Sequence, residues 1–322
     1  MVTKENGIRM LLGVAVFVGT AGVARDANAV LLNVPYVVNG QTLVAESGTA
    51  GDAAYFNGKY YFAYIRTDSS IGIVVESNIG TSGQSAVLTS VPGPAVLGPA
   101  LLALNGTLYL FYVTPGAFGS LEMRRSTNGT TWDGPWFLFS PGSSDPGWSF
   151  TTPPVAVAWD GQPVVFATQA NSHSASLIVQ FNITGTTVTG SSLPGPPFET
   201  KSRASATVWQ GALYLAWLDQ SSNQVGVAHW TDSAGWSAET LTGKSGVPSI
   251  YPLDAGSLQM VYRGSDSHIY YSWAPNGVSF GTSYEDTAST TNHQAVQFTD
   301  YDLTGNLVFY IGIDSELFVV LE

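Results

Sequence analysis

The chain is built from short apolar runs that are separated by glycine and by small polar residues. In the clearest stretch, Ala204–Trp209 and Ala212–Leu218 are apolar runs on either side of the turn Gln210-Gly211. Gln224–Trp230 then alternates between apolar and polar positions, and Trp236–Leu241 follows a further polar turn. Runs of this length with turn residues between them predict four antiparallel β-strands joined by tight hairpins.

The same four-strand pattern recurs along the chain. Each copy has a glycine between its first two apolar runs, at intervals of 45 to 55 residues. A regular period in this range is typical of propellers and solenoids, and four antiparallel strands per unit favour a β-propeller. A β-helix would have shorter repeats and a β-sandwich would show no period. The glycines are Gly58, Gly106, Gly161, Gly211, Gly256 and Gly305.

The copies predict an all-β, six-bladed β-propeller of four-stranded antiparallel blades. The last copy ends after its third strand, whereas the apolar stretch Val30–Val38 precedes the first copy. We therefore expect residues 30–38 to supply the missing outer strand and close the ring, which removes exposed sheet edges. The third copy is the least regular, so five or seven blades remain alternatives. The expected blades are 51–90, 98–140, 153–192, 203–242, 248–285 and 293–322, within one domain over 30–322.

Residues 1–29 have the features of a secretory signal peptide. Lys4 and Arg9 precede an apolar core, and the small residues ending at Ala29 fit a cleavage site. The core is roughly 15 residues long, shorter than the about 20 that span a bilayer, although a retained anchor remains an alternative. We therefore expect a secreted, extracellular protein with no membrane span after cleavage; the periplasm is the alternative location.

Composition and charge narrow the classes of partner and cofactor. The 322 residues include no cysteine and carry a formal net charge of −12, which loss of residues 1–29 would make one unit more negative. An acidic surface repels phosphate backbones, so nucleic acid is not an expected partner. Without cysteine there are no disulfides or thiolate ligands, and the four histidines lack metal-ligand spacing. We expect no cofactor or metal; a structural calcium ion in the central channel is the alternative.

Propeller topology sorts the connections onto two rims. Turns between second and third strands, together with the loops between blades, share one rim, here called the loop rim, where ligand pockets usually lie. Aromatic rings, arginines and carboxylates gathered there would suit sugars, which need stacking faces and several hydrogen-bonding groups. The competing explanation is that aspartate simply favours tight turns. The candidate ligand-binding residues are Arg66, Asp68, Trp148, Arg203, Asp219, Arg263, Asp266 and His293.

Two motifs carry a resemblance to known propellers. "STNGTTW", Ser126–Trp132, resembles the aspartate box of sialidase-type propellers, with Asn128 in place of the aspartate. Such a box lies in the turn between third and fourth strands, away from the pocket, so we expect a structural turn there. "YRGSDSHIYYSW", Tyr262–Trp273, resembles the repeat of propeller lectins, including the fucose-binding kind. The resemblance implies a propeller fold and a glycan as the ligand.

The resemblance to sialidases also implies three arginines that converge on a carboxylate. Arg66, Arg203 and Arg263 lie on different predicted blades, but the early Arg-Ile-Pro signature of that family is absent. No glutamate occupies a recognisable partner position, and no G-x-S-x-G elbow indicates a serine hydrolase. We therefore favour a lectin-like glycan binder over an enzyme. A sialidase-like glycoside hydrolase and a protein-binding scaffold without a small-molecule site remain the alternatives.

Overall fold

The computed structural model describes residues 34–35, 37–38, 41–42, 51–76, 87–91, 93–140, 149–170, 176–191, 198–200, 202–254, 256–290, 296–299, 306–311 and 317–321. The expected signal peptide, Trp148 and His293 lie outside these residues. The described residues form β-strands and no α-helix, so none of them belongs to a helix that could span a bilayer.

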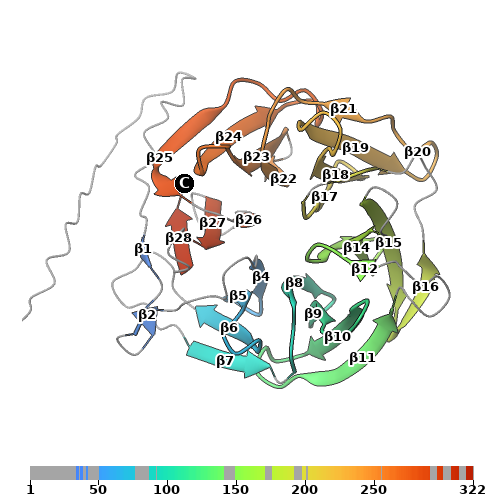
Figure 1. The fold of residues 1–322 in the computed structure, drawn as a ribbon, viewed down its shortest axis with the longest axis vertical. Coiled ribbons are helices and arrows are strands. Elements are labelled where there is room, and N and C mark those ends of the chain that lie inside the picture. Colours follow the sequence, from blue (N-terminus) through green and yellow to red (C-terminus); the bar gives the residue numbers. More distant parts are fainter. Residues whose placement is uncertain are drawn as a thin grey trace, which may run out of the picture.

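The fold is a β-propeller of four-stranded antiparallel blades, and most blades are formed by consecutive strands. Their sheets are arranged around a common centre (Figure 1). Blade 1 contains β4 (Asp52–Phe56), β5 (Lys59–Ile65), β6 (Ile71–Glu76) and β7 (Val87–Val91). Blade 2 contains β8 (Leu97–Leu104), β9 (Thr107–Thr114), β10 (Ser120–Ser126) and β11 (Asp133–Phe139).

The next three sheets continue around the centre. Blade 3 contains β13 (Val155–Trp159), β14 (Gln162–Ala170), β15 (Leu177–Thr184) and β16 (Thr187–Ser191), with β12 (Ser149–Phe150) added to β14. Blade 4 contains β17 (Ser205–Trp209), β18 (Ala212–Leu218), β19 (Val225–Thr231), β20 (Gly235–Trp236) and β21 (Thr240–Leu241). Blade 5 contains β22 (Val247–Asp254), β23 (Ser257–Arg263), β24 (His268–Ala274) and β25 (Tyr284–Thr290).

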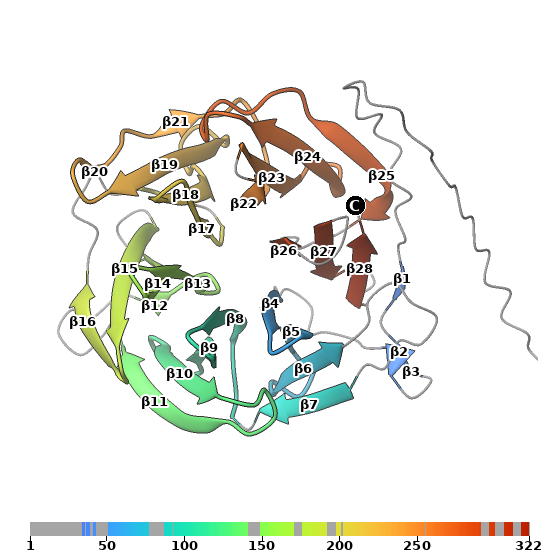
Figure 2. The same ribbon diagram turned by 180° about the vertical axis from the view of Figure 1, so that it is seen from behind.

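A further sheet joins strands from both ends of the sequence. It has the order β1 (Val34–Pro35), β28 (Leu317–Leu321), β27 (Asn306–Ile311) and β26 (Val296–Thr299). Val34 lies opposite Val319 in an antiparallel pair. Figure 2 shows β1 and β28, from the two ends of the sequence, on the same side of the ring. β26 contacts β22 on one side and β4 on the other. A separate two-stranded sheet pairs β2 (Val37–Val38) with β3 (Gln41–Thr42).

The hairpins between first and second strands follow from the Asn-Gly-like pairs of the sequence. In four blades the two turn residues have φ of 49–50° and 70–75°, the left-handed pair of a type I′ turn. Its twist matches that of the flanking strands, so each hairpin can be specified locally. The four pairs are Asn57-Gly58, Asn105-Gly106, Asp160-Gly161 and Gln210-Gly211.

The core lies between blades, because the second strands are covered on both faces. Every described residue of β18 except Leu218 is buried, and β5 is buried throughout after Lys59. Apolar clusters join blade 1 to blade 2, blade 2 to blade 3, blade 3 to blade 4 and blade 4 to blade 5. The near-continuous apolar runs of the sequence therefore correspond to strands sandwiched between neighbouring sheets.

The fourth strand of blade 4 is interrupted, so the expectation of a continuous strand over Trp236–Leu241 is wrong. β20 pairs with the end of β19 and β21 with its beginning. Between them, the Ser237 amide donates to the His229 carbonyl (2.8 Å), and the His229 amide donates to Ser237 Oγ (3.1 Å). The side-chain oxygen replaces a backbone acceptor here, a local competition with the ladder that a hydrophobic pattern does not reveal.

The motif Ser126–Trp132 forms the turn between β10 and β11, as the resemblance implied. Ser126 Oγ accepts a hydrogen bond from the Gly129 amide (2.7 Å). Asn128 Oδ1 accepts from the Thr130 amide (2.9 Å) and from that of the following threonine (2.8 Å). The Trp132 side chain packs against the cluster between blades 1 and 2. The polar residues therefore satisfy turn amides, and the tryptophan anchors the turn.

Gly129→Ala is expected to destabilise the protein more than Gly106→Ala. Both glycines have left-handed φ, 76° and 70°, so both substitutions cost about 1 kcal/mol of backbone strain. At Gly106 no atom lies within 4 Å of the added Cβ, whereas at Gly129 the Cβ would overlap the Tyr61 hydroxyl. Overpacking should lower the free energy of unfolding of Gly129→Ala by about 1–3 kcal/mol more, as measured by urea denaturation. Equal losses would contradict this packing.

Candidate functional site

Two cavities among the described residues are large enough for a small ligand. The channel cavity, of about 340 Å³, lies among the first strands of blades 1 to 5. The rim cavity, of about 310 Å³, lies between the segment that follows β21 and the β23–β24 turn of blade 5. The channel cavity is lined by the predicted candidate Arg203 and the rim cavity by the predicted candidate Asp266, so both cavities are considered as ligand sites.

The channel cavity has a buried ion pair on its wall. Arg203 Nη2 lies 3.0 Å from Asp52 Oδ2, and only 5% of the arginine side chain is exposed. The other two guanidinium nitrogens donate to the carbonyls of Gly51 (2.9 Å) and Pro154 (3.0 Å). Asp52 Oδ2 also accepts from the Leu101 amide (3.0 Å). The pair therefore ties together the first strands of blades 1 and 2, the segment before β13 and the segment before β17.

Two opposing effects act on the pKa of Asp52 in this pair. Burial raises the pKa of Asp52 above its ordinary value of 3.8, against the lowering effects of the Arg203 charge and of the backbone amides. Asp52 is the one carboxylate among the described residues that line the channel cavity. Glycoside hydrolysis ordinarily needs two carboxylates across the scissile bond. The described lining therefore lacks that pair, and all three guanidinium nitrogens of Arg203 are engaged within the protein.

Arg66 and Asp68 lie in the β5–β6 turn of blade 1. Arg66 Nη1 is 4.0 Å from Asp68 Oδ2, and both side chains are exposed. Asp68 Oδ1 accepts from the Ser70 amide (3.0 Å) and from Ser70 Oγ (2.5 Å). These bonds lower the pKa of Asp68, because they favour the charged carboxylate. The aspartate thus has the contacts of a turn-forming residue.

Asp219 has a comparable role in the β18–β19 turn of blade 4. Its Oδ1 accepts from the amides of Ser221 (3.1 Å) and Ser222 (2.6 Å). Burial alone would raise the pKa of Asp219, but the hydrogen bonds from the two serines outweigh it and the pKa lies below the ordinary value. Turn geometry is therefore sufficient to explain an aspartate at this position.

The β23–β24 turn of blade 5 is built like the turn of blade 1. The Gly264 amide donates to the His268 carbonyl (2.9 Å), as the Arg66 amide does to Ser70 (2.8 Å). By this register Asp266 is the equivalent of Asp68, but Arg263 is the equivalent of the buried Ile65 and not of Arg66. Neighbouring positions of a strand point to opposite faces, so the two arginines are not equivalent in their blades.

Blade 5 differs from blades 1 and 4 at the residue of its third strand that pairs with an aromatic residue of the second strand. Gly72 lies opposite Tyr64 in blade 1, and Gly226 lies opposite Trp217 in blade 4. Each aromatic ring lies where the Cβ of a larger residue would be. In blade 5 the pair is two tyrosines instead, at residues 262 and 270, whose rings stack with centroids 5.4 Å apart. The Tyr270 ring borders the rim cavity.

Polar groups surround the stacked rings in the rim cavity. Tyr262 donates to Ser283 Oγ (2.7 Å), and Tyr270 donates to Asp266 Oδ2 (2.6 Å). The bond to the carboxylate raises the pKa of Tyr270 to about 12. Lys244 brings an ammonium group, which donates to the Gly281 carbonyl (2.6 Å). One cation, one carboxylate, serine hydroxyls and an aromatic pair thus line a single cavity.

Of the eight sequence candidates, Asp266 lines the rim cavity and Arg203 lines the channel cavity. Arg263 lies in the chain between Tyr262 and Gly264, which both line the rim cavity. The prediction did not include Lys244, Tyr270 or Ser283. A signal for Tyr270 was present in the sequence, because the third strands "IGIVVE" and "VGVAHW" have glycine at the second position, where the aligned segment "IYYSWA" of blade 5 has tyrosine. Trp148 and His293 lie outside the described residues.

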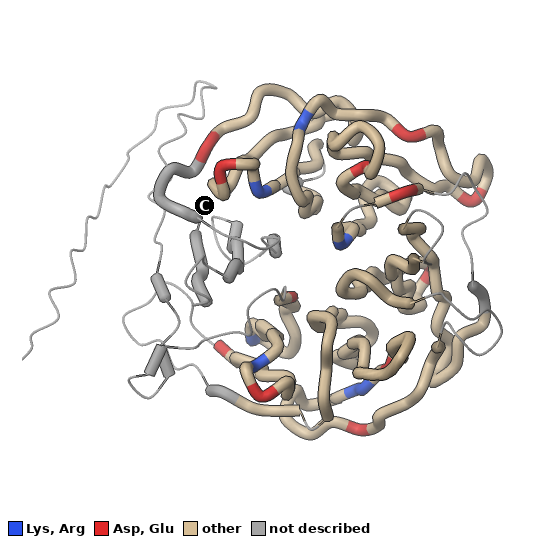
Figure 3. Tube along the Cα trace, viewed as in Figure 1, with Lys and Arg blue, Asp and Glu red and all other residues tan. Residues whose placement is uncertain are grey.

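Basic positions in the described blades are few, and apart from the adjacent Arg124 and Arg125 they are separated from one another (Figure 3). The described residues therefore form no basic stripe of the kind that follows a phosphate backbone. This distribution agrees with the acidic composition and gives the rim cavity a single ammonium group, that of Lys244, among its lining residues.

Comparison with known proteins supports the fold. No protein-family model matches the sequence, and no curated protein matches it. The structure is similar to a six-bladed fungal lectin from Aleuria aurantia with a fucose recognition mode (TM-score 0.58, 15% identity, 84% of this chain and 89% of that chain). It is also similar to a Penicillium chrysogenum α-L-arabinanase complexed with arabinobiose (TM-score 0.62, 10% identity, 84% and 92%).

A third similar structure is a subtype N10 neuraminidase-like protein of A/little yellow-shouldered bat/Guatemala/060/2010 (TM-score 0.58, 10% identity, 90% of this chain and 97% of that chain). The neighbours of this chain are thus propeller lectins and propellers of the sialidase and arabinanase kind. The structural similarity, with TM-scores of 0.58–0.62, shows a shared β-propeller fold; at identities of 10–15%, activity has to be argued from the site.

Proposed function

We propose that this protein is a secreted, lectin-like β-propeller that binds glycans at the rim cavity of blade 5. The observation that carries the proposal is that Tyr270 stands where blades 1 and 4 have glycine, which places a stacked tyrosine pair beside Asp266 and Lys244. Sugars present hydroxyls that both donate and accept hydrogen bonds, together with C–H faces that pack on aromatic rings. The cavity offers partners for each of these groups.

The remaining architecture is part of the same proposal. The sheet that combines β26, β27 and β28 with β1 would be the sixth blade, and β1 its outer strand. The contacts of β26 with β22 and with β4 support this arrangement. Residues 1–29 would be removed on export, and residues 30–322 would form one domain. Sealing a ring with strands from both ends stabilises it, because no terminal blade is left unpaired on one side.

Glycoside hydrolysis is the second, less well supported candidate function for this fold. Its support is the similarity to an arabinanase and to a neuraminidase-like protein. Against it, Asp52 is the single carboxylate in the described channel lining, and it is paired with Arg203. Arg66 lies beside a different carboxylate, Asp68. Arg66 and Arg203 are thus each paired with a different carboxylate.

The proposal is tested by glycan-array screening followed by calorimetric titration of the best glycan. Lys244→Ala and Tyr270→Gly, which restores the residue type of blades 1 and 4, should each weaken binding about tenfold or more, the loss of roughly 1.4 kcal/mol. Lys59→Ala is the matched control, because Lys59 is an exposed lysine at the hairpin on the other rim. It should bind as the unaltered protein does.

Two outcomes would overturn this assignment. Failure to retain any glycan on a broad array would exclude the lectin function. Retention that is unchanged in both Lys244→Ala and Tyr270→Gly would move the site away from the rim cavity. Release of free sugar from the array ligands would instead support the hydrolase reading.

A further inference from the structure

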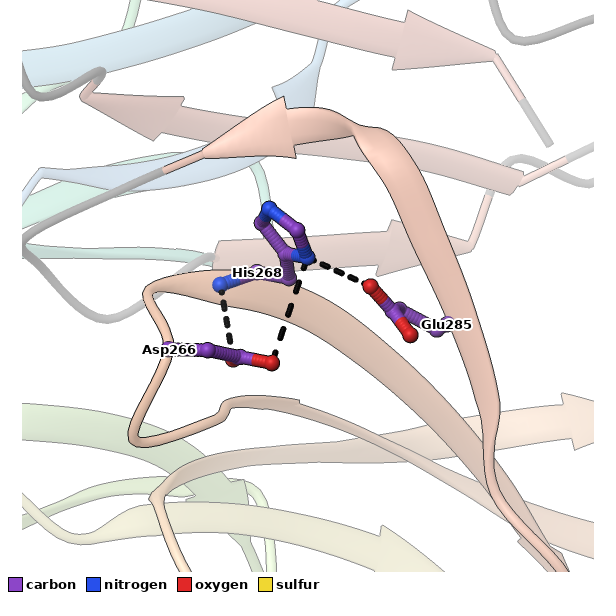
Figure 4. Close-up of side chains that lie close together, drawn as sticks. All are labelled: Asp266, His268 and Glu285. Atoms are coloured by element: carbon purple, nitrogen blue, oxygen red, sulfur yellow. Dashed lines mark hydrogen bonds and ion pairs between the residues drawn. The ribbon is translucent and has the colours of Figure 1, made fainter.

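Three potential metal ligands meet at the outer part of blade 5. Asp266 lies in the β23–β24 turn, His268 begins β24, and Glu285 lies on β25 (Figure 4). Each offers one ligand atom, and these atoms all lie within 4.8 Å of one another. Their side chains are 48%, 30% and 37% exposed, so an ion has a direct path to them.

The separations suit a small cation after modest side-chain rotation. His268 Nδ1 lies 2.5 Å from Glu285 Oε1 and 3.9 Å from Asp266 Oδ2. Ligands at the usual zinc distances of roughly 2.0–2.1 Å in a tetrahedron are about 3.3 Å apart. The first pair would therefore open and the second would close, each by less than about 1 Å. All three side chains are partly exposed, so they have room for that adjustment.

The carboxylate of Asp266 is already oriented by its neighbours. The Tyr270 hydroxyl donates to its Oδ2 (2.6 Å), and the His268 amide donates to its Oδ1 (3.1 Å). Each carboxylate oxygen has a further lone pair for an ion. Hydrogen bonds of this kind to a ligand commonly fix its direction in metal sites. One of the three ligands is thus held in place before any ion binds.

Blade 1 provides an internal comparison that separates turn formation from metal binding. Its turn has an aspartate at the same position, Asp68, which likewise accepts a hydrogen bond from the amide two residues later. The equivalents of His268 and Glu285, by strand register, are Ser70 and Ser90. The turn therefore requires the aspartate but neither the histidine nor the glutamate. These two ligand-type residues occur together in blade 5, across neighbouring strands.

We propose that Asp266, His268 and Glu285 form a binding site for a divalent transition-metal ion of the zinc class. An imidazole nitrogen with two carboxylates suits such ions, whereas calcium prefers six to eight oxygen ligands. Three protein ligands leave a fourth position for water or for an external donor. The site shares Asp266 with the rim cavity but does not use Lys244, so the Lys244 variant tests glycan binding without removing a zinc ligand.

The test is calorimetric titration of the untagged full chain with zinc chloride. One zinc ion should bind per chain with a saturable isotherm. His268→Ser, which introduces the blade 1 residue, and Glu285→Gln should each weaken zinc binding by about tenfold or more. Asp68→Asn is the matched control in the equivalent turn of blade 1, and it should leave the zinc affinity unchanged.

Crystals soaked with zinc provide a measurement that does not depend on variants. An anomalous peak at the zinc edge should lie between the three side chains. A peak elsewhere, no saturable binding, calcium binding as tight as zinc binding, or full zinc affinity in a folded His268→Ser variant would each overturn the proposal. In those cases the histidine and the glutamate form only a hydrogen-bonded pair. Glycan affinity measured in Lys244→Ala reports separately on the proposed function.

Discussion

Replacing Arg203 with methionine is expected to lower the free energy of unfolding by about 3–5 kcal/mol, because it leaves the buried carboxylate of Asp52 without its counter-charge. The guanidinium also donates to the carbonyls of Gly51 and Pro154, which lose their partners in the same step. Since these groups belong to three separate segments around the centre, the loss should loosen contacts between blades. Urea denaturation followed by tryptophan fluorescence measures the effect.

Two further variants make this prediction specific. Arg66→Met removes an arginine whose ion pair with Asp68 is exposed, so its loss should be no more than about 1 kcal/mol. Adding Asp52→Leu to Arg203→Met removes the unpaired charge and should restore part of the lost stability, because apolar replacement of a buried pair is often tolerated. If Arg203→Met and Arg66→Met lost equal stability, the buried pair would not hold the blades together.

Truncating Trp217 to alanine is expected to cost about 3–5 kcal/mol of unfolding free energy. The indole is fully buried in the cluster between blades 3 and 4, and its centroid lies 4.3 Å from that of Phe198. Opposite it in the strand pair is Gly226, which has no side chain to fill the vacated space. Thermal unfolding should therefore shift to lower temperature by several degrees.

The matched control for this prediction is Trp273→Ala. Trp273 is only half-buried and packs edge-on to the exposed Tyr284, with centroids 5.2 Å apart. Its removal leaves no closed cavity, so the loss should be clearly smaller than for Trp217→Ala. Similar losses at the two positions would show that the interface between blades 3 and 4 does not depend on the buried indole.

Local chemistry explains why much of the fold could be predicted. The turn Gln210-Gly211 adopts the expected left-handed pair of dihedral angles, and the strand over Ala212–Leu218 has the expected bounds. Both features depend on residues adjacent in the sequence. The interrupted strand after Trp236 could not be foreseen, because it depends on a side-chain oxygen, Ser237 Oγ, that accepts from an amide on the neighbouring strand.

The candidate site was predicted less completely than the fold. Asp266 was identified from its place in a turn, but the same reasoning also selected Asp68 and Asp219, whose hydrogen bonds are those of turn-forming residues. Residue type and loop position do not separate these cases. The difference lies in what each turn faces across the blade: Tyr270 in blade 5, and glycine in blades 1 and 4.

The sequence by itself determined the repeating four-stranded unit, because hairpin turns and apolar periodicity act over a few neighbouring residues. Only the tertiary structure decided which polar residues meet. Arg203 reaches Asp52 across about 150 positions of sequence because the first strands of the blades converge at the centre. His268 meets Glu285 because β24 and β25 are paired in one register, which neither residue specifies alone.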